Sequence, residues 1–189
     1  MESVELIPQP GVALLSVIEK FEKRKEELAE IISIGKTLAI DLYFYSLDYV
    51  TFSEWVLDHS ISGSSLLASS RIMERAAELI RKKIGFPFGK EMRREAVEEA
   101  TLFKKPKILH FENYVEAEGY VKKASDFIGD SSLKEILGHL RETNIDVVTL
   151  DGGGSKIFIE SVKRKFTGQI VLSEHPVSAY AKVFEYSWS

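Results

Sequence analysis

The chain has 189 residues, 44% of them hydrophobic and 29% charged, which is the composition of a globular protein large enough to bury a core. It has no cysteine, which excludes disulfides, thiolate metal sites and cysteine nucleophiles. No stretch approaches the roughly 18 consecutive apolar residues of a membrane-spanning helix, and no signal-peptide core follows Met1. We therefore expect one cytoplasmic domain over residues 1–189 without a membrane partner.

The first elements in the chain are a long helix and a buried strand. Proline and glycine at positions 8–11 precede a helical pattern over 12–34, which Gly35 ends. Its narrow apolar stripe makes residues 1–35 a candidate for pairing in a dimer. Nearly continuous apolar and aromatic residues over 37–45 predict a central strand covered on both faces.

The middle of the chain alternates helices and short strands. A capping box at Thr51 and Glu54 predicts a short helix, which a serine-rich loop at 60–65 follows. Next come a helix at 66–84 that Gly85 ends, a turn at 86–89 and a charged helix to about residue 103. The last predicted elements of this part are a strand at 107–111, helices opened by Asn113 and by Ser132, and a strand at 145–150.

The last part of the chain has a different pattern. Residues 156–166, 169–173 and 179–186 are rich in β-forming residues, although 177–188 also fits a helix. The sequence thus predicts an α/β domain, a layered sheet with helices packed on it. Residues 36–150 form its parallel body, and residues 151–189 form an antiparallel, β-rich extension.

A triple glycine lies between two apolar runs at the start of this last part. Asp151-Gly152-Gly153-Gly154-Ser155-Lys156 resembles the first phosphate-binding hairpin of the sugar-kinase, actin and Hsp70 superfamily, which reads D-G-G-G-[ST]-K. The resemblance implies a backbone that approaches ATP phosphates. Only 33 residues follow Lys156, too few for the rest of a sugar-kinase fold. We therefore predict a hairpin turn whose glycines supply positive φ, and we carry over no residue as an ATP ligand.

Small anions have two candidate sites. The serine-rich loop precedes a predicted helix N-terminus, where free amides and the helix dipole favour negative charge. The glycine turn lets the backbone approach an anion closely. The candidate anion-binding residues are Ser62, Gly63, Ser64, Ser65, Gly152, Gly153, Gly154, Ser155 and Lys156. By contrast, Gly35-Lys36-Thr37 is not predicted to be a P-loop, because a helix precedes it and a strand follows.

A metal-dependent site is an alternative interpretation. If the strands near residues 40, 109 and 148 are parallel neighbours, Asp48, Glu112 and Asp151 lie at their carboxyl edge. Three carboxylates there are able to hold Mg²⁺ for phosphodiester chemistry. Without this alternative we expect no cofactor and no metal, since the histidines lack zinc-site spacing.

Charge is unevenly distributed along the chain. The net charge is -4, yet residues 71–107 carry 11 basic and 6 acidic side chains. Such a segment is typical of a solvated helical face, and it is also compatible with nucleic-acid binding. The residues that this second interpretation selects are Arg81, Lys82, Lys83, Arg93 and Arg94.

The sequence alone favours a binding protein over an enzyme. We expect a non-catalytic α/β module that recognises a protein partner or a small anionic ligand, with a regulatory role and as a homo-oligomer. A divalent-metal phosphodiesterase or nuclease is the first alternative, and nucleic-acid binding is the second. The few Asn and Gln beside abundant Glu and Lys are typical of a thermophile's protein.

Overall fold

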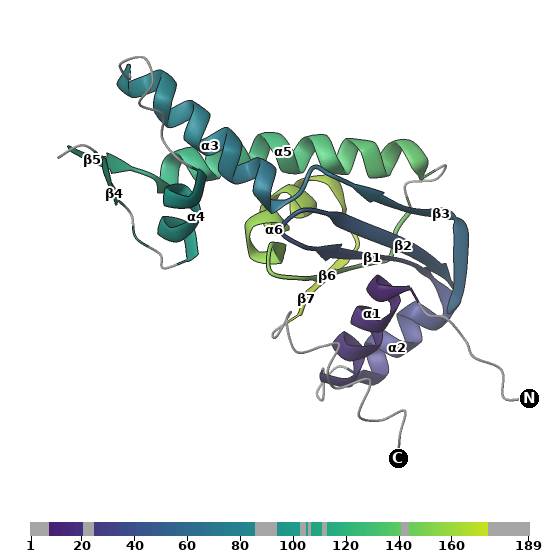
Figure 1. Ribbon diagram of the computed structural model, residues 1–189. Helices are drawn as coiled ribbons and strands as arrows, with labels where there is room; N and C mark the ends of the chain where they lie inside the picture. Colours follow the sequence, from purple (N-terminus) through teal and green to yellow (C-terminus); the bar gives the residue numbers. More distant parts are fainter. Residues whose placement is uncertain are drawn as a thin grey trace, which may run out of the picture.

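The protein is represented by a computed structural model that describes residues 8–20, 25–85, 94–102, 105, 107–110, 113–140 and 144–173 (Figure 1). Its elements are α1 (Gln9–Lys20), α2 (Lys25–Ile34), β1 (Lys36–Leu42), β2 (Leu47–Ser53), β3 (Val56–Ser65), α3 (Ser69–Ile84), α4 (Arg94–Leu102), β4 (Lys107–His110), β5 (Asn113–Glu116), α5 (Glu118–His139), β6 (Val147–Asp151), α6 (Ser155–Lys165) and β7 (Gln169–Leu172). No helix in these ranges is long and apolar enough to cross a membrane.

One five-stranded sheet with the order β3-β2-β1-β6-β7 organises the molecule. β1, β2 and β3 form an antiparallel meander, whereas β6 and β7 run parallel to β1. The predicted α/β class, a layered sheet with helices packed on it, is confirmed. The antiparallel part, however, lies in the first three strands. Of the predicted extension, the described residues 151–173 contain β7, which continues the parallel half.

Helices cover both faces of this sheet (Figure 1). Alternate residues of β1 point to opposite faces: Leu38, Ile40 and Leu42 belong to the core beneath α3, α5 and α6, whereas Ala39 belongs to the core beneath α1 and α2. All four side chains are at most 1% exposed. The position of β1 in the middle of the sheet, buried on both faces, matches the continuous apolar pattern of its sequence.

The apolar stripe of the N-terminal segment packs against the sheet of the same chain. Leu14 of α1 and Leu28 and Ile32 of α2 are each 1% exposed and pack against the sheet. The long helix expected over 12–34 corresponds to α1 and α2, and residues 21–24 between them lie outside the described residues.

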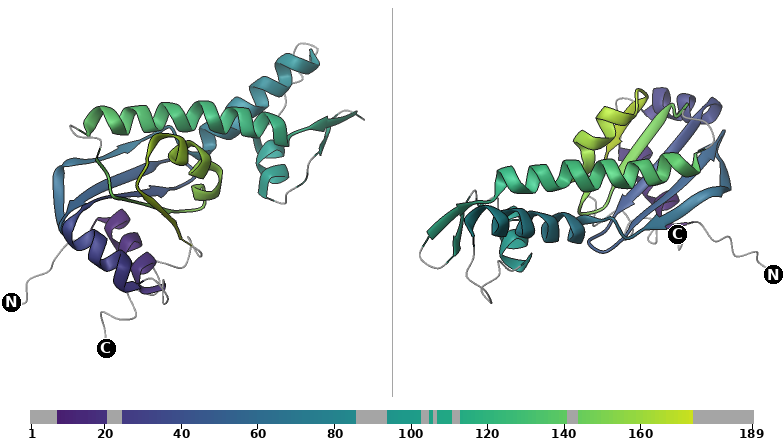
Figure 2. Two further views of the ribbon diagram at one scale, coloured as in Figure 1. Left: turned by 180° about the vertical axis from the view of Figure 1, so that it is seen from behind. Right: turned by 90° about the horizontal axis from the view of Figure 1, so that it is seen from above.

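A small lobe projects beyond the end of the sheet. α3 and α5 lie side by side and extend past the strands to carry α4 and the two-stranded ribbon of β4 and β5 (Figure 2). The strand predicted at 107–111 therefore exists but pairs with β5 in a separate antiparallel ribbon. The interpretation that it is a parallel neighbour of β1 and β6 is wrong.

The capping box predicted at Thr51 is also wrong, because a β-hairpin forms there. Thr51 lies inside β2, and the chain turns at Glu54 and Trp55 into β3. Both turn residues have positive φ, 52° and 67°, which side chains other than Gly, Asn and Asp adopt rarely. This turn lacks the Asn-Gly or Gly-containing signature by which hairpins are found in sequences.

A bulge interrupts β3 along the edge of the sheet. Tyr49 pairs with Gly63 and Thr51 pairs with Asp58, so residues 59–62 of β3 lie opposite Val50 alone. The Asp58 carboxylate accepts hydrogen bonds from the backbone N–H and the hydroxyl of Ser60, at 2.9 and 2.6 Å. The serine-rich segment is thus part of a strand and not a loop before a helix.

The helix that follows begins and ends close to its predicted limits. α3 starts at Ser69, and Gly85 ends it in the left-handed conformation (φ 68°, ψ 57°). The N–H of Gly85 donates to the carbonyl of Arg81 at 3.1 Å. This is the C-terminal glycine geometry that the sequence predicted.

Two helices in the second half differ from the predicted elements. α5 is continuous from Glu118 to His139, and Ser132 is buried within it. The Ser132 hydroxyl lies 2.7 Å from the carbonyl of Leu67 and 2.8 Å from that of Ile128, so it bonds carbonyls and caps no helix. The segment 156–166, predicted as β, corresponds to α6, whose Phe158 and Val162 are fully buried. The segment 177–188 lies outside the described residues.

Candidate functional site

Three aspartates lie in a row across adjacent strands at the carboxyl end of β1. Asp41 of β1 is the register partner of Asp48 in β2 and of Asp151 in β6. Asp41 and Asp151 are 0% and 1% exposed. The sequence identified Asp48 and Asp151 as edge residues but missed Asp41, which lies inside an apolar run. Glu112, the third predicted carboxylate, lies outside the described residues.

Burial changes the acidity of the central carboxyl group. It raises the pKa of Asp41 from 3.8 to about 7; a hydrogen bond from the Tyr43 hydroxyl opposes this shift, and the charges of Asp151 and Asp48 add to it. Burial and the hydrogen bond to Asp41 also raise the pKa of Tyr43. Asp41 therefore exists as a mixture of acid and carboxylate near neutral pH.

The triple glycine connects β6 to α6 and is not a hairpin turn. Gly152 has φ 83°, and a Cβ there would lie 2.6 Å from the backbone nitrogen of Leu42. Gly154 donates its N–H to the carbonyl of Leu42 at 3.1 Å, and a Cβ there would collide with the Ser69 hydroxyl. Gly153, by contrast, is exposed and faces open space. Two glycines thus fit the turn against β1, and the third leaves room beside the backbone.

Two helix N-termini meet at this loop. α6 begins at Ser155, directly after Gly154, and α3 begins at Ser69 against the same glycine. Neither helix has a side-chain cap. The hydroxyls of Ser69 and Ser155 are buried, and neither has a hydrogen-bond partner among the described residues. N-terminal amides and free hydroxyls at one place favour an anionic ligand.

A cavity of about 470 Å³ lies between α4, the first half of α5, and α6. Ala117, Val121 and Ile157 give it apolar walls, while Ser125 and Asp126 add polar groups. Ile157 lies in the first turn of α6, so the helix that follows the glycine loop forms part of the cavity wall. The volume is within the range of roughly 300–1,000 Å³ typical of small-molecule sites.

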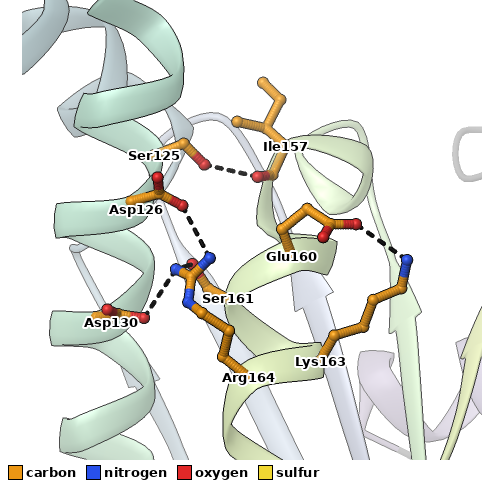
Figure 3. Close-up of polar contacts among 8 residues, drawn as sticks. All are labelled: Ser125, Asp126, Asp130, Ile157, Glu160, Ser161, Lys163 and Arg164. Atoms are coloured by element: carbon orange, nitrogen blue, oxygen red, sulfur yellow. Dashed lines mark hydrogen bonds and ion pairs between the residues drawn. The ribbon is translucent and has the colours of Figure 1, made fainter.

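Polar contacts fix the wall of the cavity where α5 meets α6 (Figure 3). Arg164 of α6 pairs with Asp126 at 2.9 Å and with Asp130 at 3.1 Å, both on α5. The Ser125 hydroxyl donates to the carbonyl of Ile157 at 2.6 Å. These contacts join α5 to α6 beside the cavity.

The other predicted site residues do not join this site. Ser62, Gly63, Ser64 and Ser65 are residues of β3, so no helix amides lie beside them, and their anion binding stays a prediction. Gly63 has a structural reason to be glycine, since a Cβ would lie 2.6 Å from the Tyr49 hydroxyl. The described residues contain no cluster of three metal-ligating side chains.

Several basic residues of this segment pair with acidic residues of the same segment. Lys82 pairs with Glu78 at 2.7 Å, and Arg94 lies 3.6 Å from Glu74. The Arg94 guanidinium also lies over the ring of Phe44, 5.6 Å from its centre. Arg81 and Lys83 lie in the last turn of α3, and Arg93 falls outside the described residues.

Solved structures of actin-like proteins share this fold. No family model matches the chain, and no curated protein matches it. A non-polymerisable quadruple mutant of pCBH ParM is 18% identical over 97% of this chain and 54% of its own, with a TM-score of 0.75. An archaeal actin homologue is 15% identical over 96% and 55%, with a TM-score of 0.77; the same homologue in complex with ADP gives 0.70. A 15-stranded ParM filament from Clostridium botulinum is 18% identical over 87% and 48%, with a TM-score of 0.67.

These comparisons show that the chain has the actin/ParM fold. It spans about half the length of the structures that it matches. They also correct the predicted function. The non-catalytic partner-binding module, the metal phosphodiesterase or nuclease, and the nucleic-acid-binding protein are all wrong, because the proteins that share the fold are actin-like filament proteins.

Proposed function

We propose that this chain forms a nucleotide-binding half of an actin-like protein. The observation that carries the proposal is the continuity between the glycine loop and the cavity through the first turn of α6. A nucleotide has an anionic end and a flat aromatic end, and the two parts of this site match them. The ADP complex of the archaeal actin homologue supports the same ligand class.

The phosphates bind beside the glycine loop. Gly153 leaves its backbone accessible there, and Ser69 and Ser155 bring buried hydroxyls and helix N-termini to the same place. The base binds in the cavity, between the apolar side chains of Val121 and Ile157.

A divalent cation enters together with the nucleotide. Mg²⁺ is usually held by one or two carboxylates together with substrate phosphates, and not by a complete protein cage. Asp41, Asp48 and Asp151 lie at the strand ends next to the loop, and one or two of them supply these carboxylates. Because part of Asp41 is protonated near pH 7, cation binding releases protons there.

Calorimetric titration with ADP and MgCl₂ tests the proposal. Gly153→Val places bulk in the open space beside the loop, at a position without positive φ, and we expect at least about a tenfold loss of affinity. Gly138→Val is the matched control, since Gly138 also faces open space but lies near the end of α5, away from the loop. The wild-type chain and the control variant bind ADP equally. Failure of the wild-type chain to bind any nucleotide contradicts the proposal.

Self-association is the second proposed property. The ParM filament supports it, and so do exposed apolar side chains at opposite ends of the molecule. Trp55 and Val56 are exposed at the turn between β2 and β3, Ile34 is exposed at the end of α2, and Tyr114 is 72% exposed in the projecting ribbon. A patch that contacts a different patch on the next copy builds open assemblies. Val56→Lys reduces assembly in sedimentation experiments if this contact forms.

A further inference from the structure

The turn between β1 and β2 lies against the N-terminus of α3. We call residues 43–46, which join these two strands, the hairpin tip. Given the proposed function, we propose that the hairpin tip is a lid, which occupies the N-terminus of α3 in this structure and which a nucleotide phosphate displaces. The inference rests on the nucleotide site proposed above and adds how access to its phosphate end is controlled.

One backbone hydrogen bond places the hairpin tip at this helix end. The Ser70 N–H, in the first turn of α3, donates to the carbonyl of Phe44 at 2.7 Å. The first amides of a helix lack acceptors within the helix, and they are the groups that bind anions at helix N-termini. Because an N–H has one hydrogen, the Phe44 carbonyl and a phosphate oxygen compete for it.

Two hydroxyls at the same place are available to an anion. The Ser69 hydroxyl points at Gly154, where an added Cβ would collide with it. Ser69 is 5% exposed and Ser155 is 1% exposed, and neither hydroxyl has a hydrogen-bond partner among the described residues. A buried hydroxyl without a partner is unfavourable, and an anion removes this penalty by accepting its hydrogen. Of these three donors, the Ser70 amide is the one that the hairpin tip already occupies.

The rings of the hairpin tip are not part of a hydrophobic core. Three of its four residues are aromatic, yet neither core within the described residues includes any of them. Tyr45 is 64% exposed and meets Phe44 edge to face, with the ring centres 4.8 Å apart. Burial of aromatic rings is what usually fixes a segment in place. The hairpin tip lacks this anchor.

The other bonds of the hairpin tip leave it able to move. The Tyr43 N–H donates to the carbonyl of Ser46 at 2.9 Å, but this bond lies within the tip and moves with it. The Tyr43 hydroxyl bonds to Asp41 at the start of the tip. Leu42 and Leu47, on either side of the tip, are fully buried. These two leucines therefore define fixed ends between which the tip opens.

Arg94 holds the ring of Phe44 from outside the anion site. Its guanidinium lies 5.6 Å from the centre of the ring. Arg94 is the first residue of α4, in the small lobe that projects beyond the sheet (Figure 2), and it also lies 3.6 Å from Glu74 of α3. A cation–π contact at an exposed site shifts an equilibrium by roughly a factor of two to five. Arg94 thus favours the closed lid by about this factor.

A phosphate is a stronger acceptor than the carbonyl that it replaces. Hydrogen bonds to a charged group are roughly twice as strong as those between neutral groups. A phosphate therefore displaces the Phe44 carbonyl from the Ser70 amide, at the cost of opening the hairpin tip. The measured affinity equals the intrinsic affinity multiplied by the fraction of molecules whose lid is open. A variant that opens the lid more often should bind phosphates more tightly.

Hydrogen exchange of the Ser70 amide, followed by NMR on the full chain without ligand, measures lid opening. Phe44→Ala removes the ring and Arg94→Met removes the cation, so each should lower the protection of this amide about two- to fivefold. Phe44→Tyr keeps a ring under the cation and should exchange like the wild type. Lys82→Met is the control for lost charge, since Lys82 pairs with Glu78 elsewhere on α3.

Calorimetric titration then measures the effect on binding. The probes are ADP and inorganic pyrophosphate, each with MgCl₂, because pyrophosphate has phosphates but no base. We expect Phe44→Ala to bind both probes about two- to fivefold more tightly than the wild type, and Phe44→Tyr to bind them as the wild type does.

The outcomes separate the lid from the nucleotide site. Unchanged protection of the Ser70 amide in both Phe44→Ala and Arg94→Met refutes the lid. ADP binding to Phe44→Ala that is equal to or weaker than ADP binding to the wild type also refutes it, while the nucleotide site stands. If neither the wild type nor Phe44→Ala binds ADP or pyrophosphate, the proposed function fails, and this inference fails with it.

Discussion

Replacing Asp41 with asparagine should stabilise the protein at neutral pH. The side chain is fully buried, and its pKa is raised from 3.8 to about 7 in the folded chain. At a pH between 3.8 and about 7, the Asp41 carboxyl group has lost its proton in the unfolded chain but keeps it in the folded chain. The wild-type free energy of unfolding therefore decreases as pH rises through this window, at about 1.4 kcal/mol per pH unit, and levels off above pH 7.

The size of the effect follows from the two pKa values. About three pH units separate them, which corresponds to about 4 kcal/mol of stability that Asp41 costs the wild-type chain at pH 7 relative to pH 4. Asparagine has nearly the same shape, does not titrate, and its amide oxygen is still able to accept the hydrogen bond from Tyr43. The variant should therefore lack this part of the pH dependence.

Urea unfolding of both proteins at several pH values between 4 and 8 measures this difference. The stability of Asp41→Asn minus that of the wild type should rise steadily with pH and reach a plateau near pH 7. Asp130→Asn, which removes an exposed carboxylate, should give a difference within about 1 kcal/mol at every pH. A difference that stays constant between pH 4 and pH 7 for Asp41→Asn refutes the argument from burial.

Three other substitutions test separate parts of the fold by the same unfolding measurement. Gly152→Ala combines an unfavourable positive φ with overlap on the backbone of Leu42, so we expect a loss of at least about 2 kcal/mol. Phe158→Ala leaves a void beneath α6 and should cost about 3–5 kcal/mol. Arg164→Ala removes two exposed ion pairs and should cost less than about 1 kcal/mol, so a larger loss means that the contact between α5 and α6 depends on it.

The sequence was most reliable where one periodicity dominated. Its continuous apolar run identified β1, and its amphipathic pattern with Gly85 identified α3. Residues 156–166 were predicted as β because Ile157, Phe158 and Ile159 follow one another. The helical signal was also present, since buried Phe158, Ser161 and Val162 have helical spacing, and packing against α5 decided between the two.

The candidate site was harder to predict, because its residues meet only in the folded chain. Asp41 lies between Ile40 and Leu42, and no local pattern distinguishes it from other strand residues. Its two aspartate neighbours come from β2 and β6, and strand order cannot be deduced from any single segment. The glycine loop was the one local motif that indicated a phosphate-binding fold. That fold was rejected because only 33 residues follow Lys156.

The bulge in β3 limits how copies of this chain are able to assemble. A regular ten-residue edge strand is a template on which another chain adds its own strand, and such growth leads to aggregation. Here residues 59–62 lie opposite Val50 alone, and Ile61 turns inward to the core. A neighbouring strand would find no even row of N–H and C=O groups along this border. For the self-association proposed above, this border therefore disfavours growth by strand addition and leaves side-chain contacts to set the geometry.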